Sequence, residues 1–289
     1  NIGSSANDGT GDTLRAAFDI CNDNFSELYG GTTSALAFKA EGTNFTGSLI
    51  IGHSTTGTIS SATYNTALGI GAMDAITTGD SNVAIGYTAG TALTTGGSNV
   101  LIGKFAGGSL VGGENNVAVG FEALNTEDGH GRNVAIGKAA LASQNAGADA
   151  YNVAIGYNTG LNVSSGVRNT IIGGFAGDAL TTGGYNIAIG YEALGTEDAG
   201  SYNVAIGNYA LQDQDAGDAY NVAVGYAAGQ NVSTGTNNTL VGGLAGDALT
   251  TGSNNIAIGR DALSTEDTRG YNIAIGSYAL QDLNAAADA

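Results

Sequence analysis

The sequence predicts a mostly β fold, a parallel β-solenoid, on three observations. A five-residue motif returns at a nearly fixed spacing, 49 glycines are present, and proline is absent. The motif is intact as Asn-Val-Ala-Ile-Gly at 82–86, and its copies are 17 residues apart except for steps of 19 and 18 residues after Asn133 and Asn203. Such self-similarity is typical of repeat architectures. The first residues of the copies are Asn65, Asn82, Asn99, Asn116, Asn133, Asn152, Asn169, Asn186, Asn203, Asn221, Asn238, Asn255 and Asn272.

Each copy is predicted to form one short strand of one coil. A 17-residue unit is too short for a two-helix repeat, which needs about 33 residues. Branched apolar residues between Asn and Gly favour a strand, and glycine-rich turns close the coil. With the degenerate copy at 48–52, about fourteen coils stacked at about 4.8 Å would make a rod of about 65 Å. The absence of proline leaves every strand amide free to donate a hydrogen bond to the next coil.

Two features of the motif lead to further expectations. The aligned asparagines predict a ladder of side-chain hydrogen bonds along the rod, and ligand binding is the alternative. Because side chains alternate along a strand, Val83 and Ile85 share one face and Ala84 lies on the other. We expect the alanine face to contact neighbouring chains, since small side chains allow close approach. Three chains around one axis, a homotrimer, is the arrangement that we expect.

A second period of four coils divides most of the repeat region into blocks 82–151, 152–220 and 221–289. For example, residues 175–182 in one block match residues 244–251 in the next. We expect three parts in the chain: an N-terminal segment at 1–30, a connector at 31–47 and the solenoid at 48–289.

The N-terminal segment is predicted to contain a short α-helix, which Asp12 or Thr13 caps and which ends near Tyr29. Its apolar residues follow the 4-3-4-3 spacing of a coiled-coil seam. A single helix of this length cannot bury such a stripe, so we expect a bundle with sister chains that serves trimerisation and attachment. Packing against its own solenoid is the alternative. The apolar residues are Leu14, Phe18, Cys21, Phe25 and Leu28.

Composition argues against several classes of partner. The chain has 26 acidic and 8 basic residues and a formal net charge of −18, so it would repel nucleic acid and anionic lipid. No apolar run approaches 18 residues, so we expect no membrane insertion. The lone Cys21 provides neither a disulfide framework nor a zinc cluster.

Catalytic constellations are not recognisable, so we expect no enzyme, no cofactor and no bound metal. His53 and His130 are predicted to be exposed turn residues. Carboxylates gather in turns at 126–128, 196–198 and 265–267, which lie four coils apart, about 19 Å. A calcium loop at 212–218 is the alternative to a solvated acidic turn, because it offers three carboxylates without the spacing of a known calcium motif.

Aromatic residues are the remaining candidates for binding. Tyr157, Tyr191 and Tyr226 follow the motif glycine, and exposed rings on a rigid rod could stack on sugars of a cell-surface glycan. The alternative is that they cover coil edges and pack against neighbouring turns.

Two family resemblances bear on this prediction. The Asn-Val-Ala-Ile-Gly coils of 48–289 resemble the head repeats of trimeric autotransporter adhesins, which implies a left-handed parallel β-roll in a trimer. Residues 7–18 and 22–29 are similar to a segment near the start of tailed-bacteriophage fibre and other virion proteins. The chain shows no autotransporter neck motif, long stalk or membrane anchor, so the combination resembles a phage fibre with an adhesin-type head.

From these features we expect a non-enzymatic structural fibre of a phage virion. It would reach and attach to a glycan or protein receptor on the host cell, and its N-terminal segment would contact other virion proteins. The alternatives are a bacterial trimeric surface adhesin, a spacer with receptor binding elsewhere, and an enzyme acting on surface polysaccharide.

Overall fold

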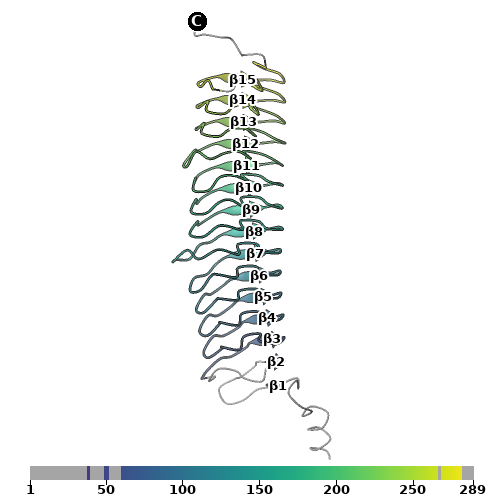
Figure 1. Ribbon diagram of the computed structural model, residues 1–289, viewed down its shortest axis with the longest axis vertical. Coiled ribbons are helices and arrows are strands. Elements are labelled where there is room, and N and C mark those ends of the chain that lie inside the picture. Colours follow the sequence, from purple (N-terminus) through teal and green to yellow (C-terminus); the bar gives the residue numbers. More distant parts are fainter. Residues whose placement is uncertain (1–37, 40–48, 52–59, 266–267, 282–289) are drawn as a thin grey trace, which may run out of the picture.

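The chain forms a β-solenoid in which one strand per coil stacks into a single long sheet (Figure 1). The structure is a computed structural model, and it describes residues 38–39, 49–51, 60–265 and 268–281. The strands are β1 Phe38–Lys39, β2 Leu49–Ile51, β3 Thr66–Leu68, β4 Val83–Ile85, β5 Val100–Ile102, β6 Val117–Val119, β7 Val134–Ile136, β8 Val153–Ile155, β9 Thr170–Ile172, β10 Ile187–Ile189, β11 Val204–Ile206, β12 Val222–Val224, β13 Thr239–Val241, β14 Ile256–Ile258 and β15 Ile273–Ile275.

The strands follow one another in sequence order, which confirms the predicted parallel solenoid. From β2 to β15 every pairing is parallel, and each strand is in line with its neighbour, as in the pairing of Ala84 with Leu101. Only β1 runs antiparallel, against β2. The described residues form no helix, and therefore none that could cross a membrane. The predicted helix within 1–30 lies outside the described residues, as does the connector apart from β1.

The expected roles of the two strand faces are reversed. We expected the alanines to face other chains, but Ala84, Ala118 and their equivalents are fully buried inside their own coils. Val83 and Ile85 lie on the outer face and are half-buried. The reason is volume: the strand lies close to the opposite wall of its coil, and its central position admits one small side chain in most coils.

The motif glycine is required by the close stacking of the coils. Gly86 has a φ of +135°, which side chains disfavour. A Cβ atom at Gly86 would lie 2.7 Å from the carbonyl oxygen of Gly103 in the next coil. The equivalent glycines from Gly69 to Gly259 face the same clash, so the end of each strand has no room for a side chain.

Interior packing explains the four-coil period. Where the strand centre is Ala118, the opposite wall of the coil carries the buried Leu124. Where the centre is Leu101, the opposite wall carries Gly107, at which a Cβ atom would meet the Leu101 side chain at 2.8 Å. Gly90 in the preceding coil also leaves room for Leu101, since a Cβ atom there would lie 2.7 Å from it. Each block therefore contains one large residue at a strand centre, with glycine opposite it in the same coil and in the preceding coil.

The same arrangement returns in the other two blocks. The large centres are Ile171 and Leu240, and the glycines opposite them are Gly177 and Gly246.

The predicted asparagine ladder is confirmed, and the structure supplies its chemistry. The motif asparagines from Asn65 to Asn255 are fully or almost fully buried. The Oδ1 of Asn169 accepts a hydrogen bond from the backbone N–H of Asn186 in the next coil at 2.9 Å, and the Asn186 Nδ2 donates to the carbonyl of Gly200 at 2.8 Å. Each side chain thus joins the backbone of neighbouring turns, so the ladder fixes the position of each coil along the rod relative to the next.

The two longer coils keep the same strand register because their extra residues lie in the turns. β7 pairs with β8, and β11 with β12, without offset. At these places the Nδ2 of Asn152 donates to the Oε1 of Gln144, and that of Asn221 donates to Gln214, both at 2.6 Å. A buried glutamine side chain therefore supports the ladder at each insertion.

The complementary sizes of the strand centre Ile171 and the opposite Gly177 are testable by a double-mutant cycle. Ile171→Ala should destabilise the rod by about 3 kcal/mol through a cavity, and Gly177→Leu should destabilise it through steric overlap with Ile171. The double variant should lose at least about 1 kcal/mol less than the sum of the single losses, because the two sites share one space. Urea denaturation followed by circular dichroism measures all three. Additive losses would contradict the proposed complementarity.

Candidate functional site

The three candidate tyrosines lie in one column of rings on the rod. Tyr157, Tyr191 and Tyr226 alternate with Phe175 and Tyr209, and each ring meets the next edge to face at centroid distances of 5.3 to 6.0 Å. Edge-to-face pairs at these distances are favourable. Each candidate ring is nevertheless 41 to 58 % exposed. The rings therefore pack against neighbouring turns and also remain open to solvent on one side.

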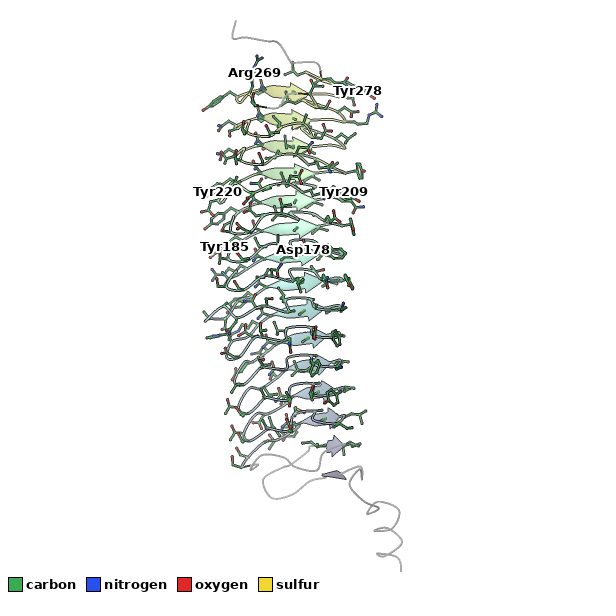
Figure 2. The ribbon with its side chains drawn as sticks, in the orientation of Figure 1. Asp178, Tyr185, Tyr209, Tyr220, Arg269 and Tyr278 are labelled. Atoms are coloured by element: carbon green, nitrogen blue, oxygen red, sulfur yellow. The ribbon has the colours of Figure 1, made fainter. Side chains whose placement is uncertain are left out.

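A second column lies along the opposite edge of the strands (Figure 2). Tyr185, Tyr202 and Tyr220 stack nearly face to face, with centroids 5.2 and 5.0 Å apart. The Arg168 guanidinium lies over the Tyr185 ring and donates a hydrogen bond to its hydroxyl. This column forms a stacked aromatic edge on the rod.

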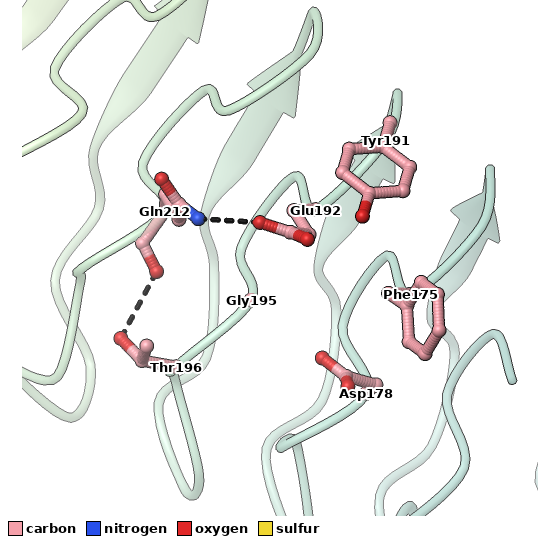
Figure 3. Close-up of a pocket in the computed structure, with 7 residues that line it drawn as sticks. All are labelled: Phe175, Asp178, Tyr191, Glu192, Gly195, Thr196 and Gln212. Carbon is pink, nitrogen blue, oxygen red and sulfur yellow. Dashed lines mark hydrogen bonds between the residues drawn. The ribbon is translucent and has the colours of Figure 1, made fainter.

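The first column borders a pocket of about 280 Å³ on coils β9 to β11 (Figure 3). Two aromatic rings form one side, and acidic and amide side chains form the other. The lining residues are Phe175, Asp178, Tyr191, Glu192, Gly195, Thr196 and Gln212. Of the three candidates, only Tyr191 reaches this pocket, and Tyr157 and Tyr226 lie further along the column on either side.

Hydrogen bonds hold the polar side of the pocket in place. The Gln212 Nε2 donates to the Glu192 Oε2 at 2.6 Å, and the Thr196 hydroxyl donates to the Gln212 carbonyl at 3.0 Å. The Oε1 of Gln212 in turn accepts from the Nε2 of Gln230 at 2.8 Å. This chain links consecutive coils, so the acceptor groups are presented by rigid elements.

Two groups in the pocket, the Asp178 carboxyl and the Tyr191 hydroxyl, have raised pKa values. Burial raises the pKa of Asp178, and the nearby Glu192 raises it further. A hydrogen bond with Glu192 raises the pKa of the Tyr191 hydroxyl further above neutral pH, at which it is already protonated. The pocket therefore combines apolar ring faces with carboxylate acceptors, the combination that sugar hydroxyls and the apolar face of a pyranose ring require.

The set of pocket residues occurs in one block. In the preceding block Gly108 stands where Asp178 does, and in the following block Arg260 replaces Tyr191. Sequence analysis missed Phe175, Asp178, Glu192 and Gln212. The signal was available in their spacing, since residues about 14 to 20 positions apart meet on adjacent coils.

The predicted histidines have different outcomes. His53 lies outside the described residues. His130 is in a turn, as expected, but its side chain is only partly exposed, and its Nδ1 lies 3.6 Å from the Glu127 Oε1. Its backbone N–H donates to the same oxygen at 3.0 Å. Two clusters in the described residues offer ligand atoms to a metal ion: Glu127, Asp128 and His130, and Glu197, Asp198 and Asp215.

Comparison with protein-family models, with curated proteins and with solved structures finds no match to this chain.

The pKa shift of Asp178 makes a prediction about stability. The raised folded-state pKa means that the folded chain holds this proton more tightly than the unfolded chain, whose value is near 3.8. The contribution of Asp178 to stability therefore falls as the pH rises from 3.8 through the folded-state pKa. Asp178→Asn should remove this part of the pH dependence and leave the protein at least as stable at about pH 7. Urea midpoints between about pH 3.5 and 7 measure it.

The exposed Asp218 provides the control, since Asp218→Asn should leave the pH profile as it is in the original chain. An unchanged profile in Asp178→Asn, or a steeper fall in stability with rising pH, would refute the assignment.

Proposed function

We propose that the chain is a non-enzymatic fibre subunit of a phage virion, an elongated homotrimer that reaches the host cell surface and attaches to it. The observation that carries the proposal is the outer face of the sheet, a stripe of apolar side chains along the whole rod. Support for the virion comes from the resemblance of residues 7–29 to virion proteins, and support for attachment comes from the aromatic pocket.

The outer stripe consists of the first and third residues of each strand. In β2 to β15 these positions carry valine, isoleucine or leucine, except for Thr66, Thr170 and Thr239. Several are more than a third exposed, as for Ile187 at 37 % and Ile258 at 38 %. Contiguous apolar surface of this extent is characteristic of interaction sites.

The periodicity of the stripe argues for a second copy of the same chain as its partner. Its side chains recur at the coil spacing of about 4.8 Å, and only a surface with the same spacing can match them along the full rod. The stripe carries no charged residue, so a chain with a net charge of −18 can still approach another copy there. A three-fold arrangement would bury the stripe of each chain against the other two, which replaces the alanine face that we expected at this interface.

Attachment to a glycan follows from the chemistry of the pocket around Tyr191. The rings of Phe175 and Tyr191 offer stacking surfaces, and Asp178, Glu192 and Gln212 offer hydrogen-bonding groups to hydroxyls. The net negative charge disfavours strongly anionic glycans and favours neutral or amino sugars.

Assembly through the outer stripe is testable with one substitution. Ile206 is on the outer face and half-buried in the single chain, so Ile206→Glu should keep the coil folded. In a trimer it would bring three carboxylates into an apolar axis, which is costly. The original chain should have three times the 28.5 kDa chain mass by light scattering, and the variant should lose that assembly.

Val111→Glu is the matched control, because Val111 is 44 % exposed and lies in a turn outside the stripe. It should assemble like the original chain. A mass of 28.5 kDa for the original chain, or an unchanged trimer in Ile206→Glu, would contradict assembly through this stripe.

Glycan binding is testable with an array of bacterial surface oligosaccharides. Tyr191→Ala should weaken the strongest binding signal about five- to tenfold, the loss expected from one stacking contact. Tyr271→Ala is the control, since Tyr271 is 84 % exposed and lies away from the pocket. Equal signals from both variants would argue against binding at this pocket.

A deletion of residues 152–220 distinguishes attachment from a spacer role. It joins Tyr151 directly to Asn221 and so preserves the Tyr-Asn junction before the next strand. Loss of binding in this shorter rod supports a receptor site in the block. Retained binding would assign the block a spacer role.

A further inference from the structure

Buried polar atoms without hydrogen-bond partners gather at two equivalent places. Most of those among the described residues lie beside the longer coils, four coils apart. One place contains Glu127, His130 and Asn133, and the other contains Glu197, Asn203 and Gln214. Because native proteins rarely leave such groups unpaired, each place calls for a bound species.

The second place combines one buried carboxylate, that of Glu197, with two exposed carboxylates, those of Asp198 and Asp215. Glu197 is fully buried, its Oε1 accepts a hydrogen bond from the Gly200 N–H at 2.6 Å, and its Oε2 has no hydrogen-bond partner among the residues that the structure describes. Asp198 is the next residue, and Asp215 comes from the following coil; both are exposed. Ligand oxygens of these three residues lie within 4.8 Å of one another.

Neighbouring coils fix the backbone of both exposed acids. The carbonyl of Asp198 accepts hydrogen bonds from the Thr181 hydroxyl at 2.7 Å and from the Thr182 N–H at 3.3 Å. The N–H of Asp215 donates to the carbonyl of Ser233 at 2.9 Å. The acids are therefore held together by the stacking of the rod, although like charges this close repel each other.

No cation of the described residues relieves this repulsion. The ion pairs seen there include Arg132 with Asp149 and Arg260 with Asp261, with His130 beside Glu127, and none of them involves Glu197, Asp198 or Asp215. The carboxylates of Glu197, Asp198 and Asp215 therefore lie close together without a basic side chain paired to them.

We propose that Glu197, Asp198 and Asp215 form a Ca²⁺ site that locks two coils of the rod together. Ca²⁺ takes oxygen ligands at about 2.3 to 2.6 Å, so oxygens on opposite sides of the ion lie about 5 Å apart, which matches the spread of this cluster. The cluster contains no histidine or cysteine, which disfavours zinc and other transition metals. The Nδ2 of Asn203 and the Nε2 of Gln214 are donors, so they serve an acceptor such as a buried water rather than the ion.

The preceding block provides a natural comparison. It retains Glu127 and Asp128, but Asn145 stands at the position of Asp215, and its backbone N–H makes the equivalent hydrogen bond to Ser164. An asparagine therefore fits this turn without disturbing the coil. The complete set of three carboxylates occurs only in block 152–220 among the described residues.

Calcium binding by the full chain, after treatment with a chelator, tests the proposal. Titration calorimetry with CaCl₂ should find one site per chain with a Kd below about 1 mM, and Ca²⁺ should raise the urea midpoint. Asp215→Asn should weaken binding at least tenfold and abolish the shift of the midpoint. Asp213→Asn, an exposed acid two residues earlier, should bind as the original chain does.

Three results would overturn the site. These are no binding by the original chain up to about 1 mM, equal binding by Asp215→Asn, or weak binding at many sites that Asp213→Asn reduces as much. Glu197→Gln gives a second measurement, because it removes the buried charge and keeps the shape of the side chain. It should lose Ca²⁺ binding and remain folded in the absence of Ca²⁺, and a variant that still binds one Ca²⁺ per chain would equally refute the assignment.

Discussion

The narrow interior of the coil is the constraint from which the rest of the rod follows. A strand of three residues turns one side chain inward, and that side chain meets the opposite wall of the same coil. The pair can be alanine with leucine, as at Ala118 and Leu124, or a large residue with glycine, as at Leu101 and Gly107. Most strand centres are therefore alanine, and the larger side chains of the strands lie at the first and third positions, which form the apolar outer stripe. A protein with such a small core depends on contacts between coils more than on contacts within them.

The spacing of the motif predicted the backbone well. Each strand from β3 to β15 begins one residue after a motif asparagine, and the asparagines form the expected ladder. Alternation along the strand could not predict which side chains face the interior. A period of two divides the side chains into two sets but does not indicate which set is inside. The decisive signal was the joint change at Ile171 and Gly177, where a large strand centre coincides with a small residue opposite. That correlation indicates a shared space, and it identifies the inward position.

The candidate site was less accessible from sequence for a geometric reason. Tyr157 and Tyr191 follow their motif asparagines by five residues, whereas Phe175 and Tyr209 follow by six, so they do not align as one column. The rings nevertheless meet because they lie on neighbouring coils at the same edge of the sheet. Likewise Asp215 was assigned to the acidic turn of its own coil, but its carboxylate lies beside Glu197 and Asp198 of the coil before. In a solenoid, the relevant neighbour of a residue is about one coil away along the chain.

The single large strand centre in each block also limits how such a rod can change its length. Removing the coil of Ile171 would leave the glycine wall of the coil before it, at Gly160, facing a void. Removing that preceding coil instead would place the Leu141 wall against Ile171. Removing four coils restores every interior contact. Genetic duplication or loss should therefore alter the length of this rod most readily in steps of about 19 Å, and related rods should differ by whole blocks.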